Sequence, residues 1–184
     1  MKLSTSSLFE LQADPYDYKQ RHFFRVCIFR DVTNAGELRN ALRTGEIDYA
    51  LIKPELVLET FVLLAAANRS IHQAAHNRMA TRSLHAELIY SLSPNRNISS
   101  SLTTFGIGET STDVLVAIFD DQKGDKMIEA SKRIKGRPVS LNELPKITNY
   151  DLIKKIYHVA ESEYNDETIT DAVVTRIITK DFTS

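Results

Sequence analysis

Residues 54–67 read PELVLETFVLLAAA, and almost every position after Glu55 in this stretch is apolar. Pro54 suits the first turn of a helix because a helix start leaves its backbone N–H groups unbonded, and Glu55 favours the positive end of the helix dipole. The pattern predicts a helix from Pro54 to about His76 that is hydrophobic on most sides. A helix of this kind belongs at the centre of a fold.

Runs of bulky, β-prone residues on both sides of this helix predict a small sheet. Residues 113–119 form the clearest strand, and residues 23–29 have the composition of a strand that is covered on both faces. Residues 48–52 predict a second short strand. The apolar residues within 8–11 are compatible with a short edge strand.

Capping and breaking residues place further helices along the chain. Asn34 followed by Glu37 resembles a capping box, and Gly45 is expected to stop that helix. Thr81 is expected to cap another helix, which Ser93-Pro94-Asn95 breaks. Apolar spacing predicts three more helices, over residues 98–105, 126–134 and 152–159.

The last segment of the chain is ambiguous between helix and strand. Ile169, Val173 and Ile177 form a stripe with helical spacing, yet β-branched neighbours such as Val174 also suit a strand. We predict a helix because the apolar spacing is four and Asp166 offers a cap.

Length and composition are those of one soluble globular domain, with 184 residues and a formal net charge of −1. We therefore predict a single α+β domain over residues 1–184, with a small sheet and several helices around the long apolar helix. The N-terminus lacks the apolar run of a secretory signal, and no apolar run can span a bilayer, so an intracellular protein is expected. Cys27 lies in an apolar run that suits a buried thiol.

Two sequence patterns are candidates for a catalytic site. His72 and His76 lie four residues apart as in a zincin motif, but Gln73 occupies the position of the catalytic glutamate. A third ligand, His85 or Glu87, would be needed to complete a metal site. Three carboxylates follow the strand at 113–119: Asp120, Asp121 and Asp125. They suit a solvated turn better than a metal site, so we predict no catalytic residue, no metal and no cofactor, and a metal-dependent hydrolase remains an alternative.

A basic and polar cluster lies around the end of the apolar helix and the start of the next one. Its members are Asn68, Arg69, Arg78, Thr81 and Arg82, with His72 and His76 nearby in the sequence. Guanidinium groups bind phosphates through two hydrogen bonds, and amides or hydroxyls can contact the edges of unpaired bases. The cluster is a candidate site for single-stranded RNA, although arginines at helix ends are usually solvated.

The run from Leu63 to Ile107 carries a resemblance to a known family. Its elements are, in order, Leu63-Leu64-Ala65-Ala66-Ala67-Asn68, Arg78-Met79, Thr81-Arg82, Leu84, Glu87, Leu92-Ser93-Pro94-Asn95, Asn97-Ile98 and Phe105-Gly106-Ile107. In order and spacing they resemble the TPRKB family, whose members bind the p53-related protein kinase in the KEOPS, or EKC, complex. Asn77 stands where the family commonly has Gly, and Asn tolerates the left-handed conformation better than most residues.

The resemblance implies a non-catalytic subunit that binds and regulates an atypical small kinase. It also implies binding of the single-stranded 3′ CCA end of tRNA by Asn68, Arg69, Arg78, Thr81 and Arg82. The complex forms threonylcarbamoyl-adenosine (t6A) in tRNA, which implies indirect contact with other KEOPS subunits and a location in cytoplasm and nucleus. A scaffold that binds only protein remains the alternative.

The C-terminal stripe Ile169, Val173 and Ile177 is the candidate surface for the kinase, as an apolar helix face laid against a partner. The same stripe can equally close the protein's own core, because an amphipathic pattern does not name what it packs against.

Overall fold

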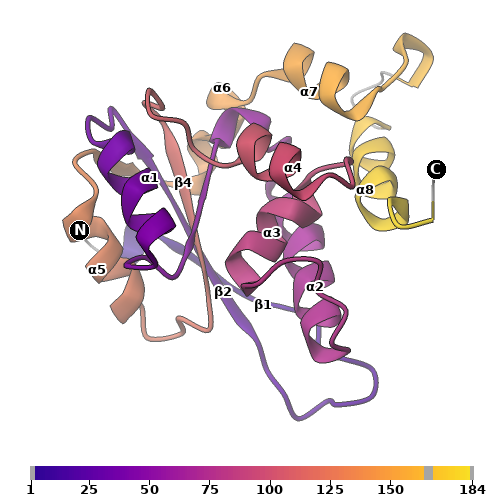
Figure 1. Ribbon diagram of the computed structural model, residues 1–184, viewed down its shortest axis with the longest axis horizontal. Helices are drawn as coiled ribbons and strands as arrows, with labels where there is room; N and C mark the ends of the chain where they lie inside the picture. The colour runs from indigo at the N-terminus through magenta and orange to yellow at the C-terminus, as the bar shows by residue number, and fades with distance from the viewer. Residues whose placement is uncertain (1–2, 164–167, 183–184) are drawn as a thin grey trace. The chain divides into compact units, whose positions relative to one another are not determined.

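The computed structural model describes residues 3–163 and 168–182, which contain eight α-helices and five β-strands (Figure 1). Contacts divide the chain into a sheet unit, Met1–Pro54 with Gly106–Glu143, and a helical unit, Glu55–Phe105 with Leu144–Ser184. The predicted α+β class is confirmed, and the expectation of one domain stays a prediction.

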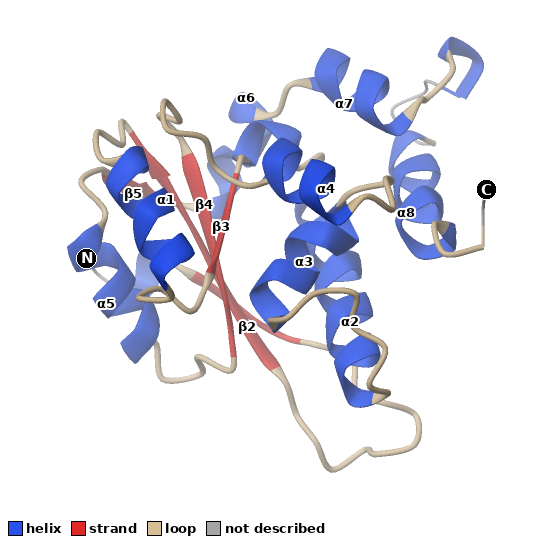
Figure 2. Ribbon diagram, viewed as in Figure 1, coloured by secondary structure: helices blue, strands red, loops and turns tan. Residues whose placement is uncertain are grey.

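The sheet unit contains one antiparallel sheet, drawn in red in Figure 2. Its strands are β1 (Ser7–Glu10), β2 (Phe23–Arg30), β3 (Ala50–Ile52), β4 (Val114–Phe119) and β5 (Arg137–Val139). The order is β1-β2-β4-β3, and β5 pairs with the same edge of β2 as β1, farther along the strand. All four predicted strands are confirmed, and every residue of β4 is buried.

One face of this sheet packs against α1 (Ala35–Thr44) and α5 (Asp125–Arg133). Cys27 from the sheet, Leu38 from α1 and Met127 from α5 belong to the resulting hydrophobic cluster. Burial of these side chains is the main stabilising contribution of this unit.

The two ends of α1 follow the prediction to different degrees. Gly45 ends the helix in the left-handed conformation, with φ of 79°, as expected of a glycine at this position. Asn34 precedes the helix but makes no side-chain cap. Its amide instead donates to the Arg133 carbonyl at 2.9 Å and accepts from the Lys135 N–H at 2.9 Å, so it joins α1 to the end of α5.

The helical unit is built from six α-helices among the described residues. They are α2 (Thr60–Ala75), α3 (Leu84–Leu92), α4 (Ile98–Phe105), α6 (Leu144–Ile147), α7 (Tyr150–Tyr157) and α8 (Ile169–Thr179). The apolar helix α2 packs against both α3 and α8. In the described part of the chain, no helix combines the length and apolar character needed to cross a bilayer.

The predicted start of α2 at Pro54 is wrong, because a short 3₁₀ turn at Pro54–Leu56 precedes the helix, which begins at Thr60. The intervening backbone finds partners outside a helix. The Thr148 hydroxyl donates to the Val57 carbonyl at 2.9 Å, and the Asn149 N–H donates to the Glu55 carbonyl at 2.8 Å. These bonds satisfy carbonyls that a continuous helix would have used.

The predicted C-terminal helix is confirmed as α8, and Asp166, expected as its cap, lies outside the described residues. Ile169, Val173 and Ile177 are 4%, 0% and 0% exposed and contribute to the core of the helical unit. Of the two interpretations left open for this stripe, burial supports the core. These three side chains therefore do not form the free surface that direct contact with a kinase requires.

Alanine substitutions at Ile177 and at its neighbour Ile178 compare how the buried and the exposed face of α8 contribute to stability. Ile177→Ala should lower the free energy of unfolding by about 2–5 kcal/mol, since it leaves a cavity in the core. Ile178 is 53% exposed, so Ile178→Ala should change stability by less than about 1 kcal/mol. Urea unfolding followed by circular dichroism measures both, and equal losses would contradict the buried position of Ile177.

Candidate nucleic-acid interface

The α2–α3 loop, residues 76–83, carries three of the five residues of the predicted RNA site. Asn77 has a φ of 52°, in the left-handed region, which confirms the expectation that Asn takes this conformation here. The Arg78 N–H bonds to the Gln73 carbonyl at 2.8 Å and closes the end of α2. The backbone thus turns sharply before the arginines.

A buried carboxylate on α3 holds the far side of this loop. Glu87 is 1% exposed, and its Oε2 accepts from the Thr81 N–H at 2.9 Å and the Thr81 hydroxyl at 2.7 Å. Thr81 was expected to cap α3, but Ser83 does so, with its Oγ accepting from the Ala86 N–H at 3.1 Å. Thr81 is therefore an anchor of the loop, and its hydroxyl is already engaged.

Arg69 is engaged by other residues of the helical unit, which differs from the expectation of a phosphate contact. Its side chain is 9% exposed, its Nη1 donates to the Ser91 hydroxyl at 2.9 Å, and its Nη2 donates to Asp181. The nearest carboxylate oxygen of Glu87, Oε1, lies 4.0 Å from Nη1. Arg69 thus pairs with the buried carboxylate of Glu87 and the partly exposed carboxylate of Asp181, and these contacts leave little of its guanidinium for RNA.

Arg78 and Arg82 are the members of the predicted site that face solvent. Both are exposed, and neither guanidinium has a hydrogen bond or ion pair with any residue that the structure describes. Asn68 is half-buried, and its amide donates to the Leu64 carbonyl at 3.0 Å within α2. The structure therefore separates the five residues into two exposed cations and three groups engaged in intramolecular bonds.

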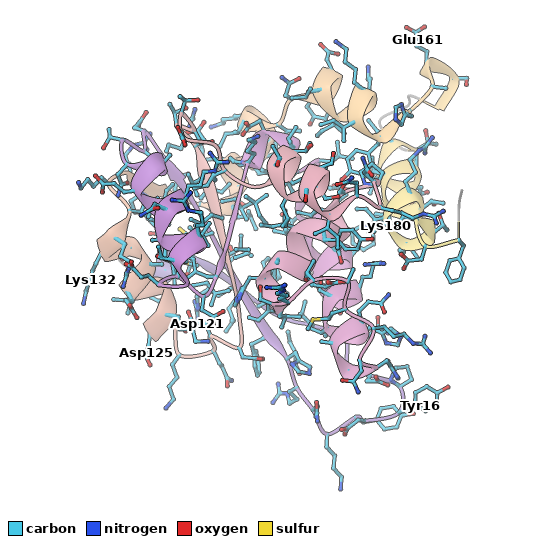
Figure 3. All side chains as sticks on the ribbon, viewed as in Figure 1. Tyr16, Asp121, Asp125, Lys132, Glu161 and Lys180 are labelled. Atoms are coloured by element: carbon cyan, nitrogen blue, oxygen red, sulfur yellow. The ribbon has the colours of Figure 1, made fainter. Side chains whose placement is uncertain are left out.

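Lys180, labelled in Figure 3, completes this charge network, although no local sequence pattern singles it out. Its ammonium group is buried, donates to the carbonyls of Tyr90 and, at 3.0 Å, Ser93, and lies 3.3 Å from the centre of the Tyr90 ring. Burial, with a further contribution from the charge of Arg69, lowers the pKa of Lys180 to about 7. Asp181 is the next residue in the chain. Lys180 therefore binds α3 while its neighbour Asp181 binds α2.

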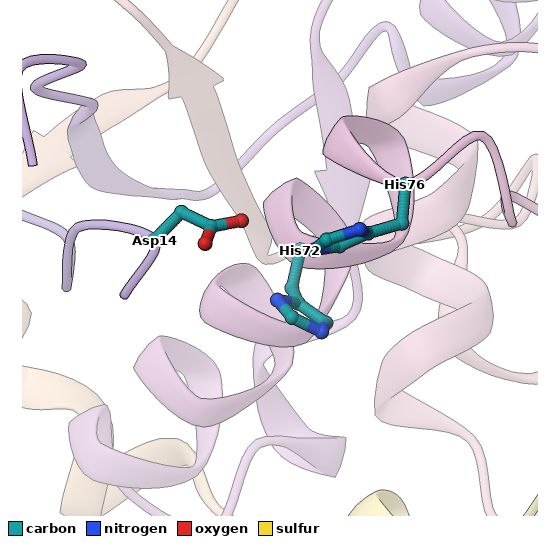
Figure 4. Close-up of side chains that lie close together, drawn as sticks. All are labelled: Asp14, His72 and His76. Atoms are coloured by element: carbon teal, nitrogen blue, oxygen red, sulfur yellow. The ribbon is translucent and has the colours of Figure 1, made fainter. Parts of the chain in front are cut away.

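Figure 4 shows the two imidazoles of the considered metal motif on one face of α2. The rings of His72 and His76 lie with centroids 4.5 Å apart, and both side chains are exposed. Glu87, a candidate third ligand, instead accepts a hydrogen bond from Thr81 and pairs with Arg69. Within the helical unit the pair supplies two ligands, and a catalytic zinc ion takes three from the protein.

Of the three carboxylates that follow β4, Asp121 has a structural role, whereas Asp120 and Asp125 are exposed. Asp121, expected in a solvated turn, is 4% exposed and accepts from the N–H groups of Lys126 and Met127 at the start of α5. Arg25 lies 3.6 Å from it and donates to its carbonyl. The thiol of Cys27 is buried, and desolvation raises its pKa to about 11, which disfavours the reactive thiolate.

Comparison with known proteins places this geometry in a family. The sequence model of the family described as "Kinase binding protein CGI-121" matches residues 29–181. The chain belongs to the CGI-121 family. The resemblance inferred from residues 63–107 is thereby confirmed, and it extends over most of the chain.

Several relatives of this CGI-121 family chain carry the name of a complex. It is 36% identical over 155 residues to the EKC/KEOPS complex subunit TPRKB of Danio rerio, covering 84% of this chain and 89% of the relative. It is 32% identical to the EKC/KEOPS complex subunit CGI121 of Yarrowia lipolytica, over 72% and 77% of the two chains. The corresponding subunit of Kluyveromyces lactis is also 32% identical, over 74% and 87%.

Removal of the buried arginine tests the charge network of this CGI-121 family chain. Arg69→Ala leaves Glu87 buried without its cation, so we expect a loss of about 3 kcal/mol in the free energy of unfolding. Arg78→Ala removes an exposed and unpaired cation and should cost less than about 0.5 kcal/mol. Chemical denaturation of both variants measures the difference, and an Arg69→Ala protein as stable as Arg78→Ala would refute the role of Arg69.

Proposed function

We propose that this chain is a non-catalytic subunit of the EKC/KEOPS complex. In this proposal it binds and regulates the complex's atypical small kinase and recruits tRNA by its single-stranded 3′ CCA end, in support of t6A formation. Family membership and the names of the relatives support the role in the complex. A location in both cytoplasm and nucleus is part of the same proposal.

The observation that supports RNA binding is a pair of exposed arginines on a loop that is held in place by hydrogen bonds. Arg78 and Arg82 have no intramolecular partner among the described residues, so contact with phosphate would break no existing bond. Thr81, between them, is fixed to Glu87 by two hydrogen bonds. A loop that is ordered before binding loses less conformational entropy on contact with RNA.

Each arginine can donate two parallel hydrogen bonds to a phosphate of the tRNA tail. Arg69 and Thr81 support the contact indirectly, by holding the loop, while the half-buried amide of Asn68 lies on α2 next to Arg69. The chain has nearly balanced charge, so binding rests on this local pair rather than on a general attraction to polyanions.

Charge reversal of the two arginines tests the RNA contact. Arg78→Glu combined with Arg82→Glu should weaken binding of intact tRNA by at least about tenfold, because two attractive contacts become repulsive. The slope of log affinity against log salt concentration should also become shallower, by about 0.7 for each single-strand phosphate that the variant no longer neutralises. Filter binding or fluorescence anisotropy over a salt series gives both quantities.

The matched control reverses two exposed arginines of the sheet unit, Arg43→Glu with Arg137→Glu, and should leave tRNA binding nearly unchanged. The unmodified protein should also bind tRNA that lacks its CCA end more weakly than intact tRNA. Equal loss in the control would mean that net charge alone governs binding. Unchanged binding after CCA removal would refute recruitment by the tail.

For the kinase, we propose docking on the exposed face of α8 together with the turn that follows it. Ile178 and Phe182 lie four residues apart and are 53% and 88% exposed, whereas the buried stripe of the same helix holds it in place. Exposed apolar and aromatic side chains of this kind are typical anchors of protein interfaces.

Ile178→Asp combined with Phe182→Asp should weaken binding to the purified kinase subunit by at least about tenfold, as expected when anchor side chains are removed. Isothermal titration calorimetry measures the affinity, and circular dichroism verifies the fold. Tyr16→Asp is the control, because Tyr16 is also 88% exposed but belongs to the sheet unit. Wild-type affinity in the double variant would exclude this face of α8.

A further inference from the structure

A long loop joins the two strands of the β1–β2 hairpin in the sheet unit. It spans residues 11–22, between the end of β1 at Glu10 and the start of β2 at Phe23, whereas hairpin loops commonly have about two to five residues. The Leu11 N–H donates to the His22 carbonyl at 2.8 Å and closes the base of the loop. Long ordered loops on a rigid hairpin are typical carriers of function.

Two tyrosine side chains of this loop project into solvent. Tyr16 and Tyr18 are 88% and 78% exposed, and Tyr16 is labelled in Figure 3. Neither hydroxyl has a hydrogen bond with any residue that the structure describes. Folding normally buries much of an aromatic side chain, so two exposed tyrosines only two residues apart point to a role outside the core.

The other tyrosines that the structure describes are less accessible. Tyr49, Tyr90 and Tyr157 are 7%, 5% and 1% exposed, and Tyr150 is 40% exposed in the first turn of α7. An enzyme that acts on tyrosine hydroxyls therefore reaches the loop pair without opening a helix or the core.

Acidic residues lie next to both exposed tyrosines. Asp14 precedes Tyr16 by two residues, and Asp17 lies between the two tyrosines. The Asp14 carboxylate accepts from the Tyr16 N–H at 2.8 Å, and the Asp17 carboxylate accepts from the Lys19 N–H at 3.3 Å. These bonds form a turn that presents the tyrosines together with negative charge.

The turn can be straightened without disturbing the sheet. Among the described residues, every hydrogen bond of residues 15–19 is to another residue within 14–20. The Asp17 N–H, for example, donates to the Asp14 carbonyl at 3.0 Å. Local opening of such a loop costs little, so its tip can take the extended form that enters the cleft of a modifying enzyme.

We propose that Tyr16 and Tyr18 are phosphorylated by a tyrosine kinase that selects acidic sequences. The phenolic oxygen attacks the γ-phosphorus of ATP, the bond from that phosphorus to the β–γ bridging oxygen breaks, and ADP leaves. The phenolic proton passes to the catalytic base of the kinase. Each phosphate adds roughly two negative charges at pH 7, in a chain whose formal net charge is −1. The loop thereby becomes an anionic epitope of the kind that arginine clusters recognise.

This site is independent of the proposed contacts with tRNA and with the kinase subunit. The loop belongs to the sheet unit, whereas the α2–α3 loop and α8 belong to the helical unit. Failure of the phosphorylation experiment therefore leaves the proposed role in the EKC/KEOPS complex untouched, and the reverse also holds.

The test treats the folded protein with Mg²⁺, ATP and a purified tyrosine kinase domain that prefers acidic residues before the tyrosine. Peptide mass spectrometry should locate phosphate on Tyr16 and Tyr18. Tyr16→Phe combined with Tyr18→Phe keeps both rings and removes the acceptor oxygens, so incorporation should fall at least about tenfold. Phosphorylation of an acidic glutamate–tyrosine copolymer verifies that the kinase is active.

Tyr150→Phe is the matched control. Tyr150 is followed by Asp151 as Tyr16 is followed by Asp17, but it lies in a helix. Its removal should leave incorporation unchanged, because a helical backbone must unfold locally to enter the kinase cleft. Asp14→Asn combined with Asp17→Asn should lower the rate at least about threefold, since charge complementarity with the kinase is lost.

The protein isolated from its own cells, after inhibition of tyrosine phosphatases with orthovanadate, should yield phosphopeptides that contain Tyr16 and Tyr18. Three results would overturn the proposal. They are the recovery of this segment from the cells only in unmodified form, equal incorporation in the wild type and the Tyr16→Phe, Tyr18→Phe protein, and labelling of Tyr150 as strong as that of the loop.

Discussion

The helical unit depends on one buried carboxylate, that of Glu87. An ionised side chain with 1% exposure is stable only where hydrogen bonds and a counter-charge replace the lost water. Thr81 supplies two hydrogen bonds to Oε2, and Arg69 supplies the nearest cation. Because Oε1 has no hydrogen bond among the described residues and Arg69 lies 4.0 Å from it, the compensation is incomplete, so loss of either partner is expected to be costly.

This requirement for compensation joins three segments that are distant in the sequence. Arg69 lies on α2, Glu87 on α3, and Asp181 just after α8. Lys180, next to Asp181, binds carbonyls at the end of α3 and thereby holds the turn at Ser93-Pro94-Asn95. The end of α8 is consequently part of the support for both the α2–α3 loop and this turn, and a truncation there removes more than an apolar stripe.

Most structural features that depend on local sequence patterns were predicted from the sequence. Strands, helix types and the left-handed Asn77 followed from β-propensity, apolar spacing and the conformational tolerance of single residues. The start of α2 was missed because the backbone near Val57 bonds to Thr148, a partner 91 residues away. The intramolecular pairing of Arg69 was missed for the same reason, since Asp181 lies 112 residues from it and no local pattern signals that pair.

Burial decides which members of a sequence pattern are available for binding. On α8 the sequence shows a regular apolar stripe. Its residues, Ile169, Val173 and Ile177, are buried in the protein's own core. The exposed Ile178 does not belong to that stripe and is visible as a candidate contact only when the packing of α8 is known. The same holds at the α2–α3 loop, where Arg69 belongs to the basic cluster of the sequence yet is enclosed by Ser91 and two carboxylates. Amphipathic spacing identifies a helix and its apolar face, but the surface left for a partner is what remains after the chain has satisfied its own apolar and charged groups.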